Sequence, residues 1–482
     1  MDRFYVTTPI YYVNDKPHIG TAYTTIVADM LARWRRTYDE DVRFLTGTDE
    51  FAQKTVDAAK KAGEETQAYA DRMAAVWRST WKKLGISNTD FIRTTEPRHI
   101  EVVQEIWRRV QAAGDIYKGQ YQGLYCEGCE AFKNEDELVN GLCPDHKTKP
   151  EFVSEENYFF RLSNYQKRLL DFYDTQSDFV VPSYRLNEVK SFVAAGLEDI
   201  SISRAKRSWG IPVPDDPGQV IYVWFDALVN YISAVGIEGW EAHPADVHVM
   251  AKDIIRFHAV IWPAMLMSAG LPLPGQIVAH GFLTMNGVKI SKSLGNVINP
   301  LDITEKYGVD ALRYFLLREI PFGEDGDFSE AKAGERYRSD LANGLGNFAA
   351  RVLTLAEKEK ELACALPSHE FEQRIAEMKR LVHEKMGEYK FSEALAAVWA
   401  AVAFGDRYME EKKAWGIKDE AKRRLVLCNL TLLLEGVAEA LVPFLPDAAA
   451  KIRQAIVREG EVLNVKKTEI LFPRLKIPQL KK

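Results

Sequence analysis

Apolar positions near the start of the chain change their spacing twice, which predicts two strands with a helix between them. The segment "FYVTTPI" is a short run rich in aromatic and β-branched residues, as expected of a buried strand. "DVRFLTGTDE" has the same character and ends in a turn. Between them the apolar positions take the three-four spacing of one helix face: Ile19, Ala22, Tyr23, Ile26, Val27, Met30, Leu31 and Trp34. Such a strand, helix, strand unit predicts a parallel sheet.

Two polar residues fall where these strands end. His18 follows the first strand and Asp49 lies at the end of the second. Ligands of parallel sheets bind at the carboxyl ends of the strands. We therefore expect His18 and Asp49 to face one pocket, although they are thirty-one residues apart.

The sheet pattern is interrupted and then resumes. Residues 116 to about 150 have no sustained periodicity, which indicates an inserted module. "QVIYVWFDALVNYISAV" and "DVHVMAKDIIRFHAVIWPAML" each have the pattern of a sheet strand that runs into a helix. After about residue 335 helical patterns dominate, until a short strand-like tail at "TEILFPRL". One buried helical stripe is expected at Leu341, Leu345, Phe348, Val352 and Leu355.

The composition narrows the possible functions. The chain has 482 residues and is 46% hydrophobic, so two or three domains are expected. Its formal net charge is −6, so any contact with nucleic acid must be made by a local basic patch. "MDRFYVTTPIYY" lacks the features of a signal or transit peptide, which predicts a cytoplasmic protein. The most apolar window, "LVLCNLTLLLEGVAEALVPFLP", contains Glu435, Glu439 and two prolines and is expected to be a buried core helix.

The five cysteines do not suggest a disulfide scaffold. Cys364 and Cys428 have the character of small buried side chains in the helical part. The other three form, with one histidine, two ligand pairs at the spacing of a zinc knuckle; the alternative is a set of unrelated thiols. A closed structural zinc site is expected at Cys126, Cys129, Cys143 and His146.

The fragment "PHIG" stands where the first helix begins. A helix N-terminus has unpaired N–H groups and a partial positive charge, so it can bind phosphate. His18 adds a donor, and Gly20 leaves room for a ligand. Taken alone, the fragment is equally compatible with a histidine that merely caps a helix.

A second fragment favours the phosphate interpretation. In "TMNGVKISKSLGN" an Asn-Gly turn precedes Lys289 and Lys292, which alternate with serines, as in a mobile basic loop. The alternative is an ordinary solvated loop. The pair of fragments, "HIGT" and "KISKS", resembles the two ATP-binding signatures of class I aminoacyl-tRNA synthetases.

The resemblance is greatest to the methionyl-tRNA synthetases, bacterial type with one zinc knuckle, and extends over nearly the whole chain. The segments that carry it are "TTPIYYVN", "LTGTDE", "FIRTTEP", "GDIYKGQYQGLYC", "WGIPVP", "YVWFDALVNY", "KDIIRFHAVIWPA" and "YGVDALRYFLLREIPFG". It implies an α/β fold with a Rossmann-like parallel-sheet catalytic domain, split by a zinc-knuckle insertion and followed by an α-helical bundle. The expected domains are the first catalytic half at 1–115, the inserted connective domain at 116–215, the second catalytic half with the KISKS loop at 216–300, a linking region at 301–335, and an anticodon-binding domain at 336–482.

The resemblance also implies roles for individual residues. Catalysis is expected from His18, Lys289 and Lys292, which would stabilise the triphosphate and the departing pyrophosphate. Residues expected to bind ATP, with Mg²⁺, are His18, Gly20, Thr21, Asp253, Lys289 and Lys292. Residues expected to bind methionine are Ile10, Tyr11, Asp49, Trp224, Ala227, Leu228, Tyr231 and His258. Without the resemblance, Trp224 and Tyr231 would be interpreted as core aromatics.

In the helical part, Asn347 and Arg351 lie four residues apart on one face and should reach solvent together. An isolated pair of this kind is usually a polar flank. With Trp415 they match the residues by which the family reads the CAU anticodon. A Trp stacked on an unpaired base and an Arg on its edge suit single-stranded RNA.

The sequence departs from the family pattern at four positions. Thr21 replaces the second histidine of the first signature, Ala251 replaces a glycine, and "DEFA" stands where "DEHG" is usual, which places Phe51 and Ala52 there. Ala251, beside Asp253, is expected to narrow the nucleotide pocket.

The leading hypothesis is a zinc-containing enzyme that ligates L-methionine to tRNA(Met) through methionyl-adenylate, with release of AMP and diphosphate. A second hypothesis, based on the departures, is a divergent paralogue with altered amino-acid or inhibitor specificity. A third is a tRNA-binding protein without activity. The sequence ends at residue 482 without the further domain that some relatives use to dimerise, so a monomer is expected.

Overall fold

The computed structural model describes residues 2–126, 131–133, 135–144, 147–205, 208–285, 287–290, 297–359, 362–364 and 367–475, without the side chains of residues 121, 122, 131, 132, 136, 153, 288 and 289. The chain forms two compact units, residues 1–17 with 39–279 and residues 18–38 with 280–482. No helix within the described ranges is long and apolar enough to cross a membrane.

A six-stranded sheet forms the centre of the first unit, in the order β3-β2-β1-β12-β13-β7. β1 pairs in parallel with β2 and β12, and β2 pairs in parallel with β3. The bounds are β1 Arg3–Tyr12, β2 Asp41–Asp49, β3 Asp90–Arg93, β7 Val180–Val181, β12 Val247–Ala251 and β13 Gln276–His280. Consecutive residues Phe4, Tyr5 and Val6 are all buried, as is typical of a parallel strand covered on both faces. The predicted parallel sheet is confirmed.

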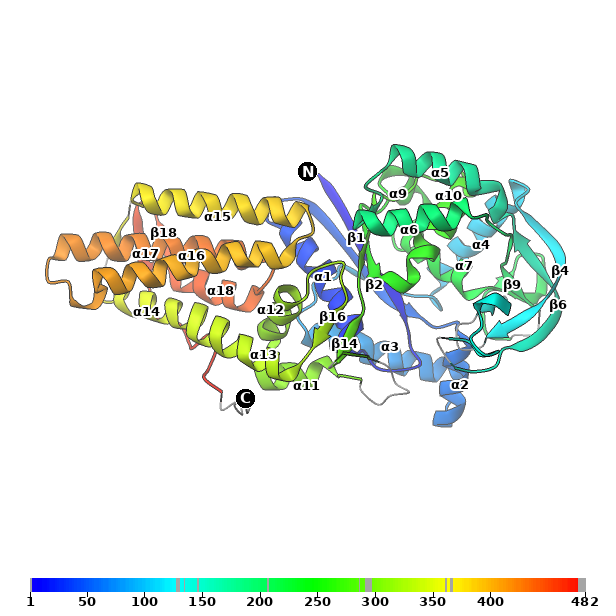
Figure 1. The fold of residues 1–482 in the computed structure, drawn as a ribbon, viewed down its shortest axis with the longest axis horizontal. Helices are drawn as coiled ribbons and strands as arrows, with labels where there is room; N and C mark the ends of the chain where they lie inside the picture. Colours follow the sequence, from blue (N-terminus) through cyan, green and yellow to red (C-terminus); the bar gives the residue numbers. More distant parts are fainter. Residues whose placement is uncertain are drawn as a thin grey trace. The chain divides into compact units, whose positions relative to one another are not determined.

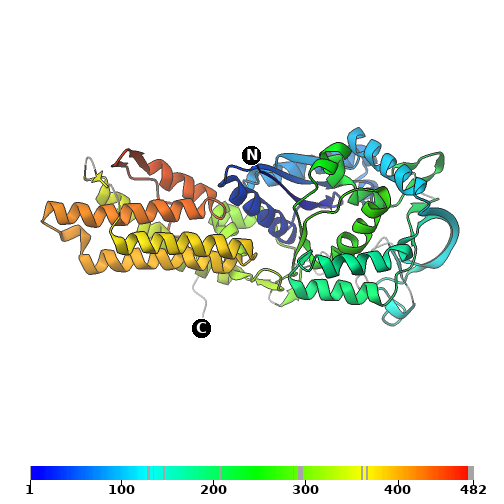
Figure 2. The same ribbon diagram turned by 90° about the horizontal axis from the view of Figure 1, so that it is seen from above.

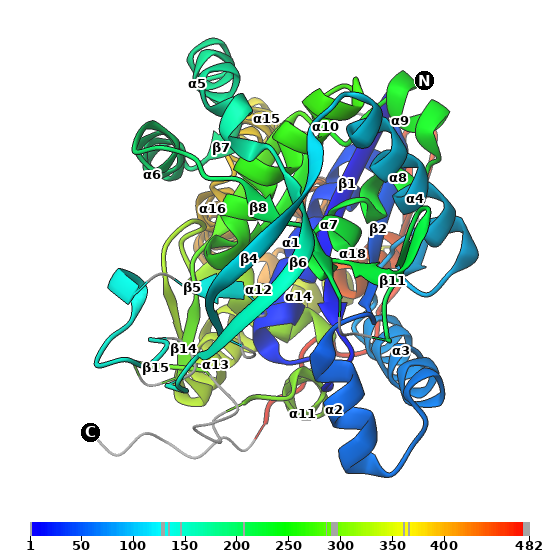
Figure 3. The ribbon, with the colours of Figure 1, turned by 90° about the vertical axis from the view of Figure 1, so that its right-hand side faces the viewer.

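An antiparallel sheet occupies the region expected to be inserted. Its order is β5-β4-β6-β8, and β4 and β6 form a long two-stranded ribbon beside the helices α5 and α6 (Figure 3). The bounds are β4 Ile116–Cys126, β5 Ala131–Lys133, β6 Glu151–Phe160, β8 Ile200–Ser201, α5 Gln166–Thr175 and α6 Ser183–Ala194. Short 3₁₀ turns lie at Glu135–Glu137 and Leu162–Tyr165.

One predicted strand joins a different sheet from the one expected. Residues 219–221 do form a strand that runs into a helix, but β11 (Asp216–Ile221) pairs antiparallel with β9 (Ser203–Arg204) and β10 (Pro212–Val213) in a small separate sheet. The parallel sheet instead takes up β7 from the inserted region. A short apolar run fits either environment, so the pattern alone did not distinguish them.

Of the remaining helices of the first unit, all but the first two contribute residues to one apolar core. They are α2 Gln53–Ala62, α3 Thr66–Lys83, α4 Pro97–Ala112, α7 Val223–Leu228, α8 Asn230–Ser233, α9 Ile237–Ala242 and α10 Trp262–Ala269, with a 3₁₀ turn at Lys252–Ile254 and a π-helical turn at Phe257–Ile261. Fully buried tryptophans mark this core: Trp107, Trp240 and Trp262.

The second unit is mainly helical. Its first helix, α1 (Ile19–Arg36), begins where the spacing predicts and ends with three arginines, which suit the negative end of the helix dipole. The long helices α15, α16 and α17 run alongside one another in both Figure 1 and Figure 2. The bounds are α11 Pro300–Tyr307, α12 Val309–Glu319, α13 Glu330–Arg336, a π-helix at Tyr337–Gly346, α14 Asn347–Ala356, α15 His369–Gly387, α16 Phe391–Lys412, a 3₁₀ turn at Ala414–Gly416, α17 Glu420–Leu441 and α18 Pro446–Ala455.

The helical predictions are confirmed in this unit. The expected stripe is buried at Leu341, Leu345, Phe348 and Val352, and Leu355 is half-buried. The most apolar window lies in α17 and the turn after it, with residues 426–434 buried.

Two small sheets complete the unit, with strands β14 Leu283–Met285, β15 Val288–Lys289 and β16 Gly326–Phe328 in one, and β17 Leu362–Ala363, β18 Ile456–Glu459 and β19 Val462–Val465 in the other. The expectation of a strand at "TEILFPRL" is wrong, because the described residues 468–475 form no strand. Pro473 lacks the N–H that a ladder needs.

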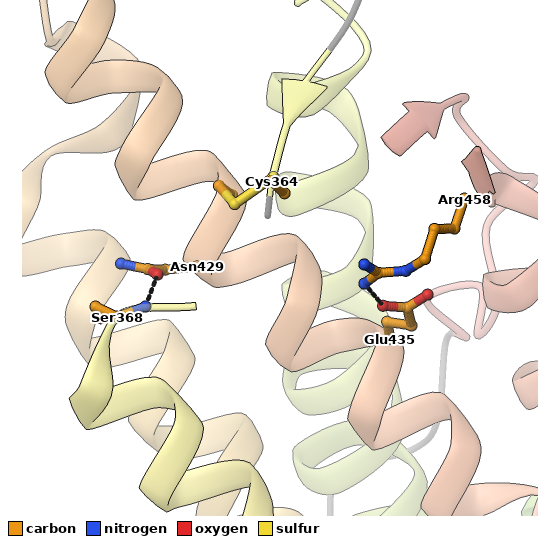
Figure 4. The surroundings of a disulfide bond; sticks show 6 residues. Cys364, Ser368, Asn429, Glu435 and Arg458 are labelled. Carbon is orange, nitrogen blue, oxygen red and sulfur yellow. Dashed lines mark hydrogen bonds and ion pairs between the residues drawn. A yellow bond between two sulfur atoms is a disulfide. The ribbon is translucent and has the colours of Figure 1, made fainter. Parts of the chain in front are cut away.

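A disulfide joins Cys364 to Cys428 on α17 (Figure 4). Both side chains are buried, as predicted, but their pairing was not expected. Nearby, the Ser368 N–H donates to Asn429 Oδ1 at 2.8 Å, so a second bond fastens this segment to α17.

Candidate functional site

His18 is the cap of α1. Its Nδ1 accepts from the N–H groups of Gly20 at 3.1 Å and Thr21 at 3.4 Å, while Thr21 Oγ1 accepts from the His18 N–H at 3.1 Å. This reciprocal arrangement is a capping box. Since Nδ1 is an acceptor, the hydrogen of the neutral ring is on Nε2, which is a donor.

Gly20 leaves the space that this geometry uses. A Cβ at Gly20 would lie 3.0 Å from Cε1 and 3.1 Å from Nδ1 of His18, closer than side chains normally approach. The glycine therefore makes room for the histidine ring itself.

The segment that follows the lysine loop reaches the same helix end. The Ile19 N–H donates to the carbonyl oxygen of Ile298 at 3.0 Å. The "HIGT" and "KISKS" regions, about 270 residues apart, therefore belong to one unit and are joined through backbone.

The strand that leads into the lysine loop is held by Asp327. Its Oδ1 accepts from the Gly287 N–H at 2.7 Å and from Thr284 Oγ1 at 2.8 Å, and the Gly287 bond contributes most to lowering the pKa of Asp327. Lys289 ends β15, opposite Thr284, with its side chain outside the described part of the structure. Lys292 lies outside the described residues altogether.

Most residues of the predicted methionine set come together in the first unit. Tyr231 and His258 are joined by a 2.7 Å hydrogen bond and are almost fully buried. Ala227 and Leu228 are also buried, on the short helix before Tyr231. Ile10 packs against the same apolar core.

The tautomer of His258 follows from its partners. Nδ1 lies 3.0 Å from the carbonyl oxygen of Ile254 and must donate to it. Burial lowers the pKa of His258 to about 4, so the ring is neutral at pH 7 and Nε2 is an acceptor. The Tyr231 hydroxyl therefore donates to Nε2, and its oxygen presents lone pairs rather than a hydrogen to other groups.

The sequence reasoning missed an aromatic partner in this set. Trp224 is half-buried and stacks face to face on Phe257, with ring centroids 3.7 Å apart. Tyr11 is buried and stacks on Trp77 at 4.9 Å. Phe257 directly precedes His258, and that adjacency was the available signal.

Asp49 ends β2 and is buried, with its backbone carbonyl near the Val13 N–H at 3.4 Å. Its neighbour Glu50 is fully buried and accepts a two-pronged bond from Arg93, at 2.7 and 2.9 Å. Asp253 is exposed in the 3₁₀ turn after β12. His18 and Asp49 lie in different units, so their shared pocket stays a prediction.

The four departures have definite surroundings. Thr21 completes the capping box with His18, and Phe51 packs against Trp209, with ring centroids 5.3 Å apart. Ala52 is fully buried at the start of α2, and Ala251 is half-buried at the end of β12.

Arg351 and Trp415 line a cleft of about 630 Å³ in the second unit, together with Ala350, Thr354, Leu355 and Glu410. The Arg351 guanidinium lies 5.4 Å from the Trp415 ring centroid and 2.6 Å from Glu410 Oε1. The Trp415 side chain is 53% exposed, which is unusual for so large an apolar group. Asn347 is half-buried at the start of α14, one turn before Arg351.

Two of the four predicted zinc ligands are described. Cys126 ends β4, Cys143 lies in a following turn, and both are buried outside any disulfide. Cys126 Sγ lies 3.9 Å from Thr148 Oγ1, and the Cys143 N–H donates to the Thr148 carbonyl at 2.9 Å. Cys129 and His146 lie outside the described residues, and no group of three metal-binding side chains occurs among those that are described.

Known proteins resemble this chain over nearly all of it. The family model for class I tRNA synthetases (M) matches residues 4–150 and 145–353. A methionine–tRNA ligase of Thermotoga maritima is 46% identical over 93% of this chain and 74% of its own length. One from Rhizobium meliloti is 47% identical over 93% of this chain and 90% of its own. The structure of Mycobacterium tuberculosis methionyl-tRNA synthetase in complex with methionyl-adenylate matches with a TM-score of 0.91 and 40% identity, over 98% of this chain and 99% of the other. The chain therefore belongs to the methionine–tRNA ligase family of class I tRNA synthetases.

Proposed function

We propose that this chain ligates L-methionine to tRNA(Met) in two steps, through methionyl-adenylate. The observation that carries the proposal is the match, over 98% of the chain, to a structure that holds methionyl-adenylate. In the first step a methionine carboxylate oxygen attacks the α-phosphorus of ATP, and the bond to the β-phosphate breaks to release diphosphate. In the second a hydroxyl of the tRNA terminal ribose attacks the adenylate carbonyl and releases AMP.

His18 and the start of α1 are suited to the charge that develops in the first step. The Nε2 donor and the N-terminal end of the helix both favour negative charge on the phosphates. Gly20 and Thr21 set the position of the ring. Lys289 and Lys292 are assigned to the departing diphosphate and Asp253 to the ribose, with Mg²⁺ bound by ATP.

The methionine site is assigned to the cluster around Tyr231. Asp49 would pair with the ammonium group, assisted by the backbone at Ile10. The Tyr231 oxygen and the stacked Trp224 would contact the side chain, since sulfur packs well against aromatic edges. The other contacts are assigned to Tyr11, Ala227, Leu228 and His258.

The cleft at Trp415 is assigned to the anticodon. An exposed indole beside a guanidinium offers a stacking face and a hydrogen-bonding edge for an unpaired base. Asn347 completes the assignment one turn away. This local site is consistent with a net charge of −6, which argues against binding by bulk charge.

A structural zinc ion is assigned to Cys126, Cys129, Cys143 and His146. The two described cysteines fit it, because both approach Thr148 and neither is in a disulfide. Zinc would hold the turns of the insertion together and take no part in the reaction. Purified wild-type protein should contain one zinc per chain, and Cys143→Ser should lose it, whereas Cys428→Ser should retain it. Equal zinc content in all three would contradict the assignment.

Amino-acid-dependent ATP–pyrophosphate exchange tests the function directly. The purified protein should exchange with methionine far faster than with the other nineteen standard amino acids, and should then charge tRNA(Met); norleucine and homocysteine are measured alongside as close analogues. Exchange dominated by another amino acid would refute the proposed substrate, and no exchange would refute the activity. The same proposal includes a cytoplasmic location and a monomeric state; sedimentation should give the mass of one chain, and the mass of a dimer would contradict the monomer.

A further inference from the structure

A buried polar network links three elements of the first unit. His99 Nε2 lies 2.6 Å from Asp226 Oδ1, and His99 Nδ1 lies 2.9 Å from Ser233 Oγ. His99 is on α4, Asp226 on α7 and Ser233 on α8. The three residues are 0%, 0% and 5% exposed.

The hydrogen bonds fix how the protons are distributed. Ser233 has one hydroxyl hydrogen and donates it to the Val229 carbonyl at 3.0 Å, so Ser233 accepts from His99 Nδ1–H. One further proton lies between His99 Nε2 and Asp226 Oδ1. Burial raises the pKa of Asp226, which favours retaining that proton. The pair is neutral overall whichever atom holds it.

A serine, a histidine and an aspartate in contact resemble a nucleophilic triad, but the geometry argues against that role. The Ser233 hydrogen is donated to Val229 rather than to the imidazole, which itself has no acceptor left for it. All three side chains are enclosed, so no substrate carbonyl can reach Ser233. The network therefore holds structure rather than performing chemistry.

The network holds two short α-helices of the proposed methionine site. α7 has six residues and carries Trp224, Ala227 and Leu228, and α8 has four and carries Tyr231. Helices this short have almost no stability of their own, so tertiary contacts must set their position. The single ring of His99 contacts both, from the rigid sixteen-residue α4.

The buried carboxyl group of Asp226 lowers stability, because one of its oxygens has no hydrogen-bond partner among the described residues. Asp226 Oδ2 and, one turn later, Asn230 Oδ1 are buried without a hydrogen-bond partner among the described residues. Buried polar atoms of this kind are rare and destabilising. A destabilising polar link directly beside Ala227 is better explained by a need to orient α7 than by a gain in stability.

We infer that His99 and Asp226 are positioning residues for methionine, which fix α7 and α8 so that Trp224, Ala227 and Tyr231 keep the shape of the amino-acid pocket. The inference rests on the proposed function. It adds to that function a connection from α4 to α7 and α8, through residues that are not among those assigned to contact methionine. None of the residues assigned to ATP lies on α7 or α8, so the KM for ATP should not depend on this link.

Steady-state ATP–pyrophosphate exchange with methionine, with the KM measured separately for both substrates, tests the inference. Asp226→Ala should raise the KM for methionine about tenfold or more, with the KM for ATP within about twofold of wild type, because loss of an interaction with one substrate raises its KM selectively. Asp226→Asn should stay within about threefold for both, because its amide can donate to Nε2 of neutral His99.

A second pair of variants covers the case in which Asp226→Ala does not fold. Ser233→Ala removes the Nδ1 contact and the hydrogen bond to the Val229 carbonyl but leaves the His99–Asp226 bond in place, and it should raise the KM for methionine about threefold. Ser268→Ala is the matched control. Ser268 lies on α10, and its buried hydroxyl donates to Asp115 Oδ2 at 2.7 Å. This variant should leave both KM values unchanged.

Equal rises in the two KM values, or an Asn variant as impaired as the Ala variant, would overturn the inference. So would an unchanged methionine KM in Ser233→Ala if Asp226→Ala cannot be purified. Absence of exchange in the wild type would instead refute the proposed function, so the two failures are distinguishable.

Discussion

Gly20→Ala provides a sharp test of the helix start, because it adds one methyl group at a known distance from His18. The new Cβ would lie 3.0 Å from Cε1 and 3.1 Å from Nδ1, so the ring must move by a few tenths of an ångström. The contact is with the ring that caps α1, not with the backbone, so the helix itself can still form. The substitution therefore perturbs the orientation of His18 and little else.

The effects on stability and on activity should separate. Replacing Gly by Ala within a helix gains about 0.5–1 kcal/mol, and weakening an N-cap costs about 0.5–2 kcal/mol. These contributions oppose each other, so the net change in the free energy of unfolding should lie between a gain of about 0.5 kcal/mol and a loss of about 1.5 kcal/mol. Removal of one well-oriented donor to a developing charge costs about 10²–10³ in rate. A displaced rather than deleted donor should lower the activation rate by about 10 to 10².

The assay is methionine-dependent ATP–pyrophosphate exchange, alongside chemical denaturation. Gly387→Ala is the matched control, because Gly387 ends α15 and no atom lies within 4 Å of the Cβ position there. That variant should gain up to about 1 kcal/mol of stability with normal exchange. If Gly20→Ala exchanges within twofold of wild type, His18 does not need this orientation, and its assigned role is wrong.

Three other predictions concern separate parts of the chain. Lys292→Ala should lower the activation rate by about 10² or more, as loss of one charge-stabilising donor typically does, and near-normal exchange would contradict its role. Trp415→Ala should raise the KM for tRNA about 5- to 150-fold, as the loss of one stacked base implies, and leave tRNA-independent exchange unchanged; a defect in exchange would refute the assignment. Burial raises the pKa of Asp310 to about 6, so the contribution of this carboxyl to stability should fall by up to about 3 kcal/mol as pH rises from 4 to 6, while the unfolded carboxyl ionises and the folded one does not. In denaturant titrations Asp310→Asn should remove that fall, and an unchanged slope would exclude Asp310 as its cause.

Local periodicity predicted helices that bury one face and strands that are buried along several consecutive residues. α1 begins at Ile19 because Pro17 and the His18 cap precede an amphipathic stripe, and β1 and β2 have apolar runs typical of central strands. The partners of a strand are set by tertiary contacts instead. The run ending at Ile221 was identified as a strand but pairs with β9 and β10, because an apolar face of a few residues does not determine which sheet covers it.

Contacts between distant segments were the main features that the sequence could not supply. His99 and Asp226 are 127 residues apart, and Cys364 and Cys428 are 64 apart, and neither pair has a local signature. The β18–β19 hairpin did have one, since Gly460 stands at a tight turn with positive φ, but its strands have only four residues each. Phe257 was missed although its neighbour His258 was found, because a stacked aromatic and a core aromatic look alike in sequence.

The two interpretations of "PHIG" were posed as alternatives, and the structure makes them compatible. A histidine that caps through Nδ1 must carry its hydrogen on Nε2, so capping fixes the tautomer that a phosphate donor requires. Thr21 belongs to the same device, because its hydroxyl accepts from the His18 N–H and donates to the His18 carbonyl at 2.8 Å. The threonine that stands in place of the family's second histidine therefore strengthens the cap. A Thr21→His variant would have to keep the His18 ring in place without the two hydrogen bonds of the Thr21 hydroxyl. If that variant kept its exchange rate but lost stability, the threonine would serve the helix start rather than the substrate.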